Sequence, residues 1–182
     1  MKQYLCLLLF ISVSFFFITC KKDKPAIDQL PSVTQTGACT FGCIVNGKVF
    51  KPKGDIFSGP ILSCANQYIN GGYYFQLTAI SKGSSTNYSI GIFTDSLKIE
   101  NNVSYTLKTK NKREGIYGLY SISEIQGLIN YITDDRYIGE LKITKLDEIN
   151  RTVSGTFWFD AVDTNGEKVE VREGRFDMPY TL

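Results

Sequence analysis

Histidine, the side chain that most often moves protons near neutral pH, is absent from this chain. Its absence excludes Ser-His-Asp and Cys-His catalysis, histidine-ligated zinc and a histidine pH switch. The remaining candidates for acid–base chemistry are carboxylates, which gather at 134–135 and over 160–173. A glycan hydrolase needs two carboxylates close together in space. Because no motif pairs any two of them, we expect a protein that is not an enzyme.

The cysteines suggest chemistry of a different kind, a disulfide in an exported protein. Cys6 and Cys20 belong to the N-terminal region, which leaves Cys39, Cys43 and Cys64 for the rest of the chain. Export exposes thiols to an oxidising compartment, so we expect one bridge. In an extended segment the Cα atoms of Cys39 and Cys43 would lie about 13 Å apart, beyond the roughly 7 Å limit of a disulfide. Cys64 is therefore the expected partner of either Cys39 or Cys43, and no metal site is expected.

Aromatic side chains are the best candidates for a binding surface. The chain has a single tryptophan, Trp158, and 11 tyrosines. Both residue types join an apolar ring to a polar group, which suits contact with a sugar or a lipid. The candidate ligand face consists of Trp158, Tyr73 and Tyr105. Because tyrosine is also a common strand residue, only exposure of Trp158 beside polar groups would distinguish a binding surface from an ordinary core.

The first 20 residues have the pattern of an export signal. Lys2 precedes an almost unbroken apolar run over 5–18, which is short for a membrane span and typical of a signal peptide. Thr19-Cys20 at its end resembles a bacterial lipobox, which implies cleavage before Cys20 and acylation of that residue. We therefore expect a signal peptide over 1–19 and a membrane partner reached through Cys20. The signal leaves open whether the anchored protein faces the periplasm or the cell exterior.

The rest of the chain divides into a tether and one domain. Residues 20–38 contain Pro25 and Pro31 and little periodicity, which predicts a lipidated, extended tether. Residues 39–182 are sufficient for a single domain. The formal net charge is only +2, from 20 Lys and Arg against 18 Asp and Glu. This balance gives no reason to expect nucleic acid as a partner, and no motif predicts a cofactor.

From Cys39 onward the apolar residues alternate with polar ones, and turn residues recur every 8–12 positions. Asn46-Gly47 between two apolar runs predicts a hairpin, and a second turn is expected at 163–166. About 9–11 short antiparallel strands are expected, forming an all-β sandwich or an open, lipocalin-like up-and-down barrel. At most one short helix is expected. Its best candidate is 121–129, which could equally form a bulged strand.

Residues 36–50 (TGACTFGCIVNGKVF) and three later stretches, at 141–145, 155–161 and 174–177, carry a resemblance. They resemble an uncharacterised lipoprotein family of Bacteroidota that is known as a domain of unknown function. The resemblance implies an outer-membrane or surface lipoprotein with an all-β domain, and it implies no catalytic residue. Asp95-Ser96-Leu97 resembles the short O-glycosylation site of such bacteria, which implies Ser96 as a modification site.

Together these patterns predict a non-catalytic, lipid-anchored protein that acts in binding or assembly at the outer membrane. One alternative is a carrier of a small apolar ligand in a barrel cavity, which would require a large interior cavity. The other is a carbohydrate-binding module or a glycan hydrolase. Trp158 and tyrosines on one exposed face, or two converging carboxylates, would favour that last alternative.

Overall fold

The computed structural model describes residues 24–54, 59–109 and 115–182. The strands join in one antiparallel sheet of eleven, which confirms the all-β fold that the alternation predicts. A short 3-10 turn, η2 (Ala26–Gln29), precedes them. The strands are β1 (Thr40–Val45), β2 (Lys48–Phe50), β3 (Leu62–Ile69), β4 (Gly72–Lys82), β5 (Thr86–Asp95), β6 (Ser104–Leu107), β7 (Gly115–Glu124), β8 (Gly127–Ile132), β9 (Gly139–Asp147), β10 (Thr152–Val162) and β11 (Lys168–Pro179). Within the described ranges, no helix has the length and apolar character needed to cross a membrane.

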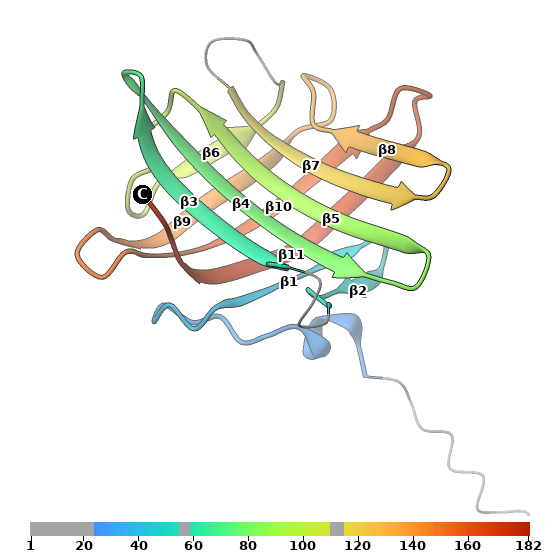
Figure 1. Ribbon diagram of the computed structural model, residues 1–182, viewed down its shortest axis with the longest axis horizontal. Coiled ribbons are helices and arrows are strands. Elements are labelled where there is room, and N and C mark those ends of the chain that lie inside the picture. Colours follow the sequence, from blue (N-terminus) through green and yellow to red (C-terminus); the bar gives the residue numbers. More distant parts are fainter. Residues whose placement is uncertain (1–23, 55–58, 110–114) are drawn as a thin grey trace, which may run out of the picture.

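The sheet folds over itself into two layers. Its strand order is β2-β1-β11-β10-β8-β7-β5-β4-β3, with β9 paired to β10 and β6 paired to β9. The fold-over occurs between β10 and β8, which share only the pair Val162–Ile132. Figure 1 shows the front layer (β3, β4, β5, β7 and β8) crossing over the back layer (β1, β2, β6, β9, β10 and β11). This arrangement lies between the two predicted architectures, a sandwich and an open barrel.

The space between the two layers is a packed apolar core. On β10 the inward residues Val153, Phe157 and Phe159 alternate with outward ones, as the sequence predicts. Phe75 and Leu77 of β4 face them from the front layer and are also buried. Alternation places one face of each strand in this core and the other on the surface. The residues that can meet a ligand therefore lie mainly on the outward faces.

Two local predictions can be compared with the structure, the hairpin turn at Asn46-Gly47 and the helix candidate at 121–129. Asn46 and Gly47 both have positive φ, at 46° and 78°, and join β1 to β2 in the expected hairpin. The segment 121–129 forms parts of β7 and β8 rather than a helix. Ile122 lies directly opposite Ile129 across this hairpin, and β-branched side chains pack well in strands. Of the two forms considered for this segment, strand rather than helix is therefore the correct one.

The turn between β10 and β11 is organised by Asp163. One of its carboxylate oxygens accepts hydrogen bonds from the amide N–H groups of Asn165 (2.9 Å) and Glu167 (2.7 Å). The other accepts one from the side-chain amide of Asn165 at 3.1 Å. The segment is thus the expected hairpin turn, closed by its own side chain.

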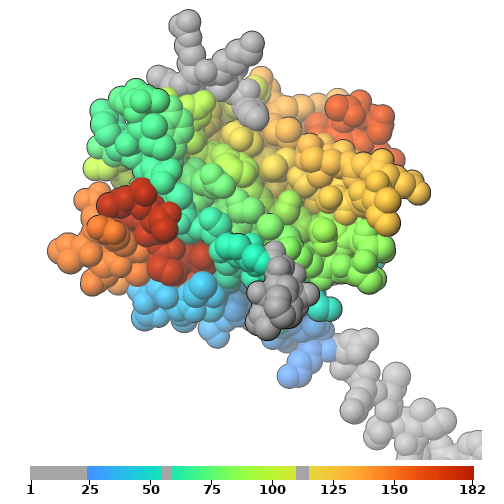
Figure 2. Space-filling model, viewed as in Figure 1, coloured from blue at the N-terminus to red at the C-terminus, as the bar shows by residue number. Residues whose placement is uncertain are grey.

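The C-terminal residues cover the free edge of β3. The amide of Thr181 donates to the carbonyl of Cys64 (3.1 Å), and the amide of Asn66 donates to the carbonyl of Thr181 (2.9 Å). Figure 2 shows these residues, in dark red, lying against the green β3. An exposed strand edge is a site of unwanted pairing, so this contact protects one end of the sheet.

Residues 34–38 are bound to the back layer by one carboxylate, although the sequence places them in a tether. Asp177 lies on the outward face of β11 and is only 1% exposed. Its oxygens accept hydrogen bonds from the hydroxyls of Thr34 (2.7 Å) and Ser154 (2.8 Å) and from the amides of Thr36 (2.9 Å), Gly37 (2.8 Å) and Ala38 (3.1 Å). We call this arrangement the Asp177 clamp. It extends the folded body beyond the expected boundary at residue 39.

The hydrogen bonds of the clamp also determine the charge state of Asp177. Burial by itself would raise the pKa of this carboxyl. The hydrogen bonds from Thr36, Thr34, Ser154 and Ala38 favour the ionised form and outweigh burial, so the pKa is lowered. Asp177 is therefore a buried carboxylate that depends on its donors.

Candidate binding site on the back layer

The outward face of the back layer is polar and contains the only tryptophan of the chain. The strand register places Trp158 of β10 opposite Glu140 of β9. In the next row Thr156 of β10 lies between Lys142 of β9 and Arg175 of β11. Both rows point away from the core because the alternate residues of β10 are buried. Trp158 thus lies among charged and hydroxyl side chains rather than in the interior.

A β-bulge in β11 shapes this face. Phe157 pairs with Gly174 and Phe159 pairs with Val171, so one residue of β10 faces two residues of β11. One of these two, Glu173, has a φ of 55°, a left-handed conformation that is uncommon for a residue other than glycine. A bulge bends its strand and changes the direction of nearby side chains, and bulges are frequent beside functional sites.

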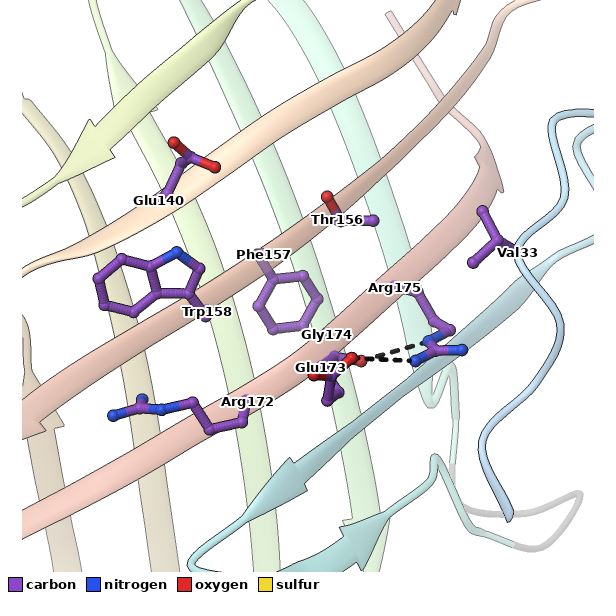
Figure 3. Close-up of a pocket in the computed structure, with 9 residues that line it drawn as sticks. All are labelled: Val33, Glu140, Thr156, Phe157, Trp158, Arg172, Glu173, Gly174 and Arg175. Atoms are coloured by element: carbon purple, nitrogen blue, oxygen red, sulfur yellow. Dashed lines mark hydrogen bonds and ion pairs between the residues drawn. The ribbon is translucent and has the colours of Figure 1, made fainter. Parts of the chain in front are cut away.

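A groove of about 440 Å³ lies at the bulge. Trp158 borders it on one side, and Val33, held in place by the neighbouring Asp177 clamp, borders it on the other (Figure 3). Gly174 also lines the groove, and a larger residue does not fit there, because a Cβ would point inward and come within 2.6 Å of the buried Phe157 ring. The volume falls within the roughly 300–1,000 Å³ of small-ligand sites.

The indole ring of Trp158 is held in position and stays partly exposed. The side chain is 39% exposed, and Figure 3 shows its ring nearly face-on between Glu140 and Arg172. The guanidinium carbon of Arg172 lies 5.6 Å from the ring centroid, within the range of a cation–π contact. Arg172 is itself fixed, because it pairs with Asp160 at 2.5 Å and donates to the carbonyl of Phe159 at 3.1 Å.

Some polar side chains around the groove are paired within the protein, and others are not. Arg175 is engaged by Glu173, with a carboxylate contact of 3.5 Å and a hydrogen bond to the Glu173 carbonyl of 3.3 Å. The side chains of Glu140 and Thr156, in contrast, form no hydrogen bond or ion pair with any residue that the structure describes. The two arginines are therefore occupied, and a carboxylate and a hydroxyl remain for a ligand.

The structure does not bring the three predicted aromatic residues to one face. Tyr73 is 37% exposed at the start of β4, where its ring lies 4.8 Å from that of Tyr68. Tyr105 points to the side of β6 that faces away from the groove, and it packs against the core. Its hydroxyl accepts a hydrogen bond from the Glu100 amide at 2.7 Å. Trp158 is thus the one member of the set that borders the groove.

The structure holds Cys39, Cys43 and Cys64 as free thiols, so neither expected disulfide of Cys64 is formed in it. Cys43 points inward from β1, and Cys64 is buried on β3. Burial raises the pKa of Cys64 to about 12 and raises that of Cys43 as well. Both behave as small apolar side chains of the core, whereas Cys39 is exposed.

We expect a thiol reagent to distinguish these three cysteines. Under native conditions N-ethylmaleimide should label Cys39, while Cys43 and Cys64 should react only after unfolding, because their thiols are buried and protonated. Peptide mapping by mass spectrometry without reductant measures this. If Cys64 stayed unlabelled together with Cys39 or Cys43 even after unfolding, a disulfide would be present and the free-thiol arrangement would be refuted.

Two other predicted positions are the modification site Ser96 and the lipidation site Cys20. Ser96 is exposed directly after β5, and its hydroxyl donates to the Asp95 carboxylate at 3.1 Å. A modifying enzyme could reach such a position. Cys20 and the expected signal peptide lie outside the described residues. Among the residues that are described, no three Cys, Asp or Glu side chains form a group that could hold a metal ion.

Sequence reasoning missed the groove because its shape depends on the bulge. The sequence of β11 did contain one signal of the bulge. Val169 and Val171 are buried at odd positions of β11, whereas Phe176 and Met178 are buried at even ones. A change of parity within one strand indicates one extra residue between the two parts. The partners that form the groove, Glu140 and Val33, carry no such signal.

One comparison with known proteins gives a match. The family described as "Domain of unknown function (DUF6252)" matches residues 96–178. The matched region includes β9, β10 and most of β11, and therefore Trp158, the bulge and Asp177. Segments 34–38 and 40–45 lie outside it. No curated protein and no solved structure matches the chain.

Proposed function

We propose that this protein is a non-catalytic binding protein of the cell envelope, anchored at the outer membrane through a lipid on Cys20. The observation that carries the proposal is the groove beside Trp158. It combines an accessible aromatic ring, a scaffold of fixed arginines, and unengaged polar groups at Glu140 and Thr156. A few polar groups around an apolar contact surface are the usual composition of a small-ligand site.

Two features favour binding at a surface over the other roles considered. The space between the layers is filled by large side chains such as Phe75, Phe157 and Phe159, which leaves an interior cargo site little support. The groove has no histidine, and Glu173, one of its two carboxylates, is paired with Arg175. A pair of free carboxylates, as glycan hydrolysis uses, is therefore not offered there.

The single tryptophan makes the proposal directly testable, because all indole fluorescence reports on the groove. Full-length protein in detergent should be titrated with tryptophan-free fractions of a bacterial envelope (polysaccharide, peptidoglycan fragments and phospholipid) by fluorescence. Periplasmic and outer-membrane protein, whose own tryptophans emit, should be titrated by calorimetry. We expect at least one fraction to bind saturably and to be recovered unchanged. If no fraction binds, or if the bound fraction is degraded, the proposal fails.

The anchor and the groove should be separable. A Cys20→Ala variant should leave the membrane pellet for the supernatant yet keep the fluorescence response of the wild type. Loss of the response in this variant would contradict a binding site that is independent of the anchor. Retention of this variant in the membrane after removal of residues 1–19 would contradict anchoring through Cys20.

A further inference from the structure

We propose that the ligand of the Trp158 groove is a neutral glycan, with one sugar ring stacked on the indole. This inference rests on the proposed binding function and adds the chemical class of the ligand. It follows from the accessible ring, from the charges around it and from the polar rows that continue beyond it.

The indole supplies a flat apolar platform. Trp158 is 39% exposed, and its ring lies nearly face-on in Figure 3 rather than edge-on. A pyranose presents C–H groups on one face and hydroxyls around its rim, so it can cover an aromatic ring without losing its polar contacts. The cation–π contact with Arg172 holds the platform in place, which lowers the entropy lost on binding.

The charges around the platform favour a ligand without net charge. Glu140 and Glu173 would repel an anionic group in the groove, and because two arginines balance these two carboxylates, the lining has no formal net charge to attract a cation. Both arginines already have carboxylate partners. The unengaged groups are Glu140, an acceptor only, and Thr156, which can donate and accept. Hydroxyl groups on the ligand are the natural complement to a free carboxylate acceptor.

The surface beyond the ring suits a chain of sugars. Glu140 lies between Trp158 and Thr106, and Lys142 lies between Thr156 and Ser104, so two polar rows cross from β10 over β9 to β6. Each neighbouring strand adds about 4.8 Å, so the rows give several sugar units room for hydrogen bonds. At the other end the groove is bordered by Val33, which the Asp177 clamp holds beside it.

The test uses full-length protein in detergent and defined hexasaccharides. The neutral probes are β-1,4-linked glucose, β-1,4-linked mannose, α-1,6-linked mannose and N-acetylglucosamine, and hexagalacturonate is the anionic control. We expect at least one neutral probe to shift the Trp158 emission saturably, and hexagalacturonate to bind less tightly than that probe. By calorimetry, Trp158→Ala should weaken binding at least about tenfold, as for other tryptophan anchors, and Glu140→Gln should weaken it by a smaller factor.

Tyr73→Ala is the matched control, because it removes a similarly exposed aromatic ring on a different surface and should leave binding unchanged. Tighter binding of hexagalacturonate than of every neutral probe would overturn the inference. Failure of all the sugars, with an envelope protein or phospholipid fraction still binding, would refute the glycan and keep the binding function. Failure of the sugars and of every envelope fraction would refute both.

Discussion

Replacing Asp177 with asparagine should destabilise the fold by about 3–5 kcal/mol, the cost of leaving several buried donors without an acceptor. One oxygen of Asp177 accepts from the Gly37 amide, and the other accepts from the Thr36 and Ala38 amides. Whichever oxygen becomes an NH₂ group, a backbone N–H would face another donor. Segment 34–38 should therefore detach from the back layer in this variant.

Urea denaturation of the wild type and of Asp177→Asn measures the effect, and limited proteolysis reports release of segment 34–38. Asp147→Asn is the control, because Asp147 also accepts amide N–H bonds, from Ile149 and Asn150, but in an exposed turn where water can replace them. Its urea midpoint should change little. Equal effects of the two substitutions would contradict the Asp177 clamp.

The same clamp predicts a direction for the pH dependence. The pKa of Asp177 is lower in the folded state than its ordinary value of about 3.9, so its contribution to stability is complete above that value. The contribution is lost as the pH falls below about 4, toward the folded-state pKa. Stability should therefore fall more steeply on acidification in the wild type than in Asp177→Asn. Parallel curves for the two proteins between pH 5 and pH 2 would show that the carboxylate is not linked to folding.

Replacing Phe159 with alanine should cost about 3–5 kcal/mol, as is typical for removing a fully buried aromatic ring. Phe159 is 0% exposed, and it occupies space that two glycines leave open. A Cβ on Gly118 of β7 would lie 2.8 Å from the Phe159 ring, and one on Gly139 of β9 would lie 2.3 Å from the Phe159 Cβ. The side chain thus fills space between the front and back layers, and little can collapse into the cavity left by its removal.

Phe93→Ala is the matched control for this substitution. Phe93 lies on the outward face of β5, half-buried, with its ring 5.1 Å from that of Tyr117. Its removal should cost about 1 kcal/mol, mainly the aromatic contact. Urea midpoints at an unchanged slope compare the two. A cost for Phe159→Ala no larger than that for Phe93→Ala would mean that the ring does not support the packing of the layers.

Local regularities in the chain were sufficient to predict its strands. The alternation along β10 identified Val153, Phe157 and Phe159 as one buried face, because successive side chains of any strand point to opposite sides. Asn46-Gly47 marked a hairpin, since both positions require positive φ. The absence of histidine excluded whole classes of chemistry without reference to any fold. Each of these inferences depends on residues next to one another or on composition alone.

The groove and the Asp177 clamp were decided by the tertiary structure. Asp177 meets Gly37 across 140 positions of the chain, and Trp158 meets Glu140 only because β10 pairs with β9 in one register. Nothing in the periodicity of a single strand specifies its neighbour, its register or the segment that covers its outward face. For the same reason the sequence grouped Tyr73 and Tyr105 with Trp158, whereas the fold places Tyr73 on another surface and packs Tyr105 against the core. Strand formation is a local property of the chain, while a binding surface requires distant segments to pack together.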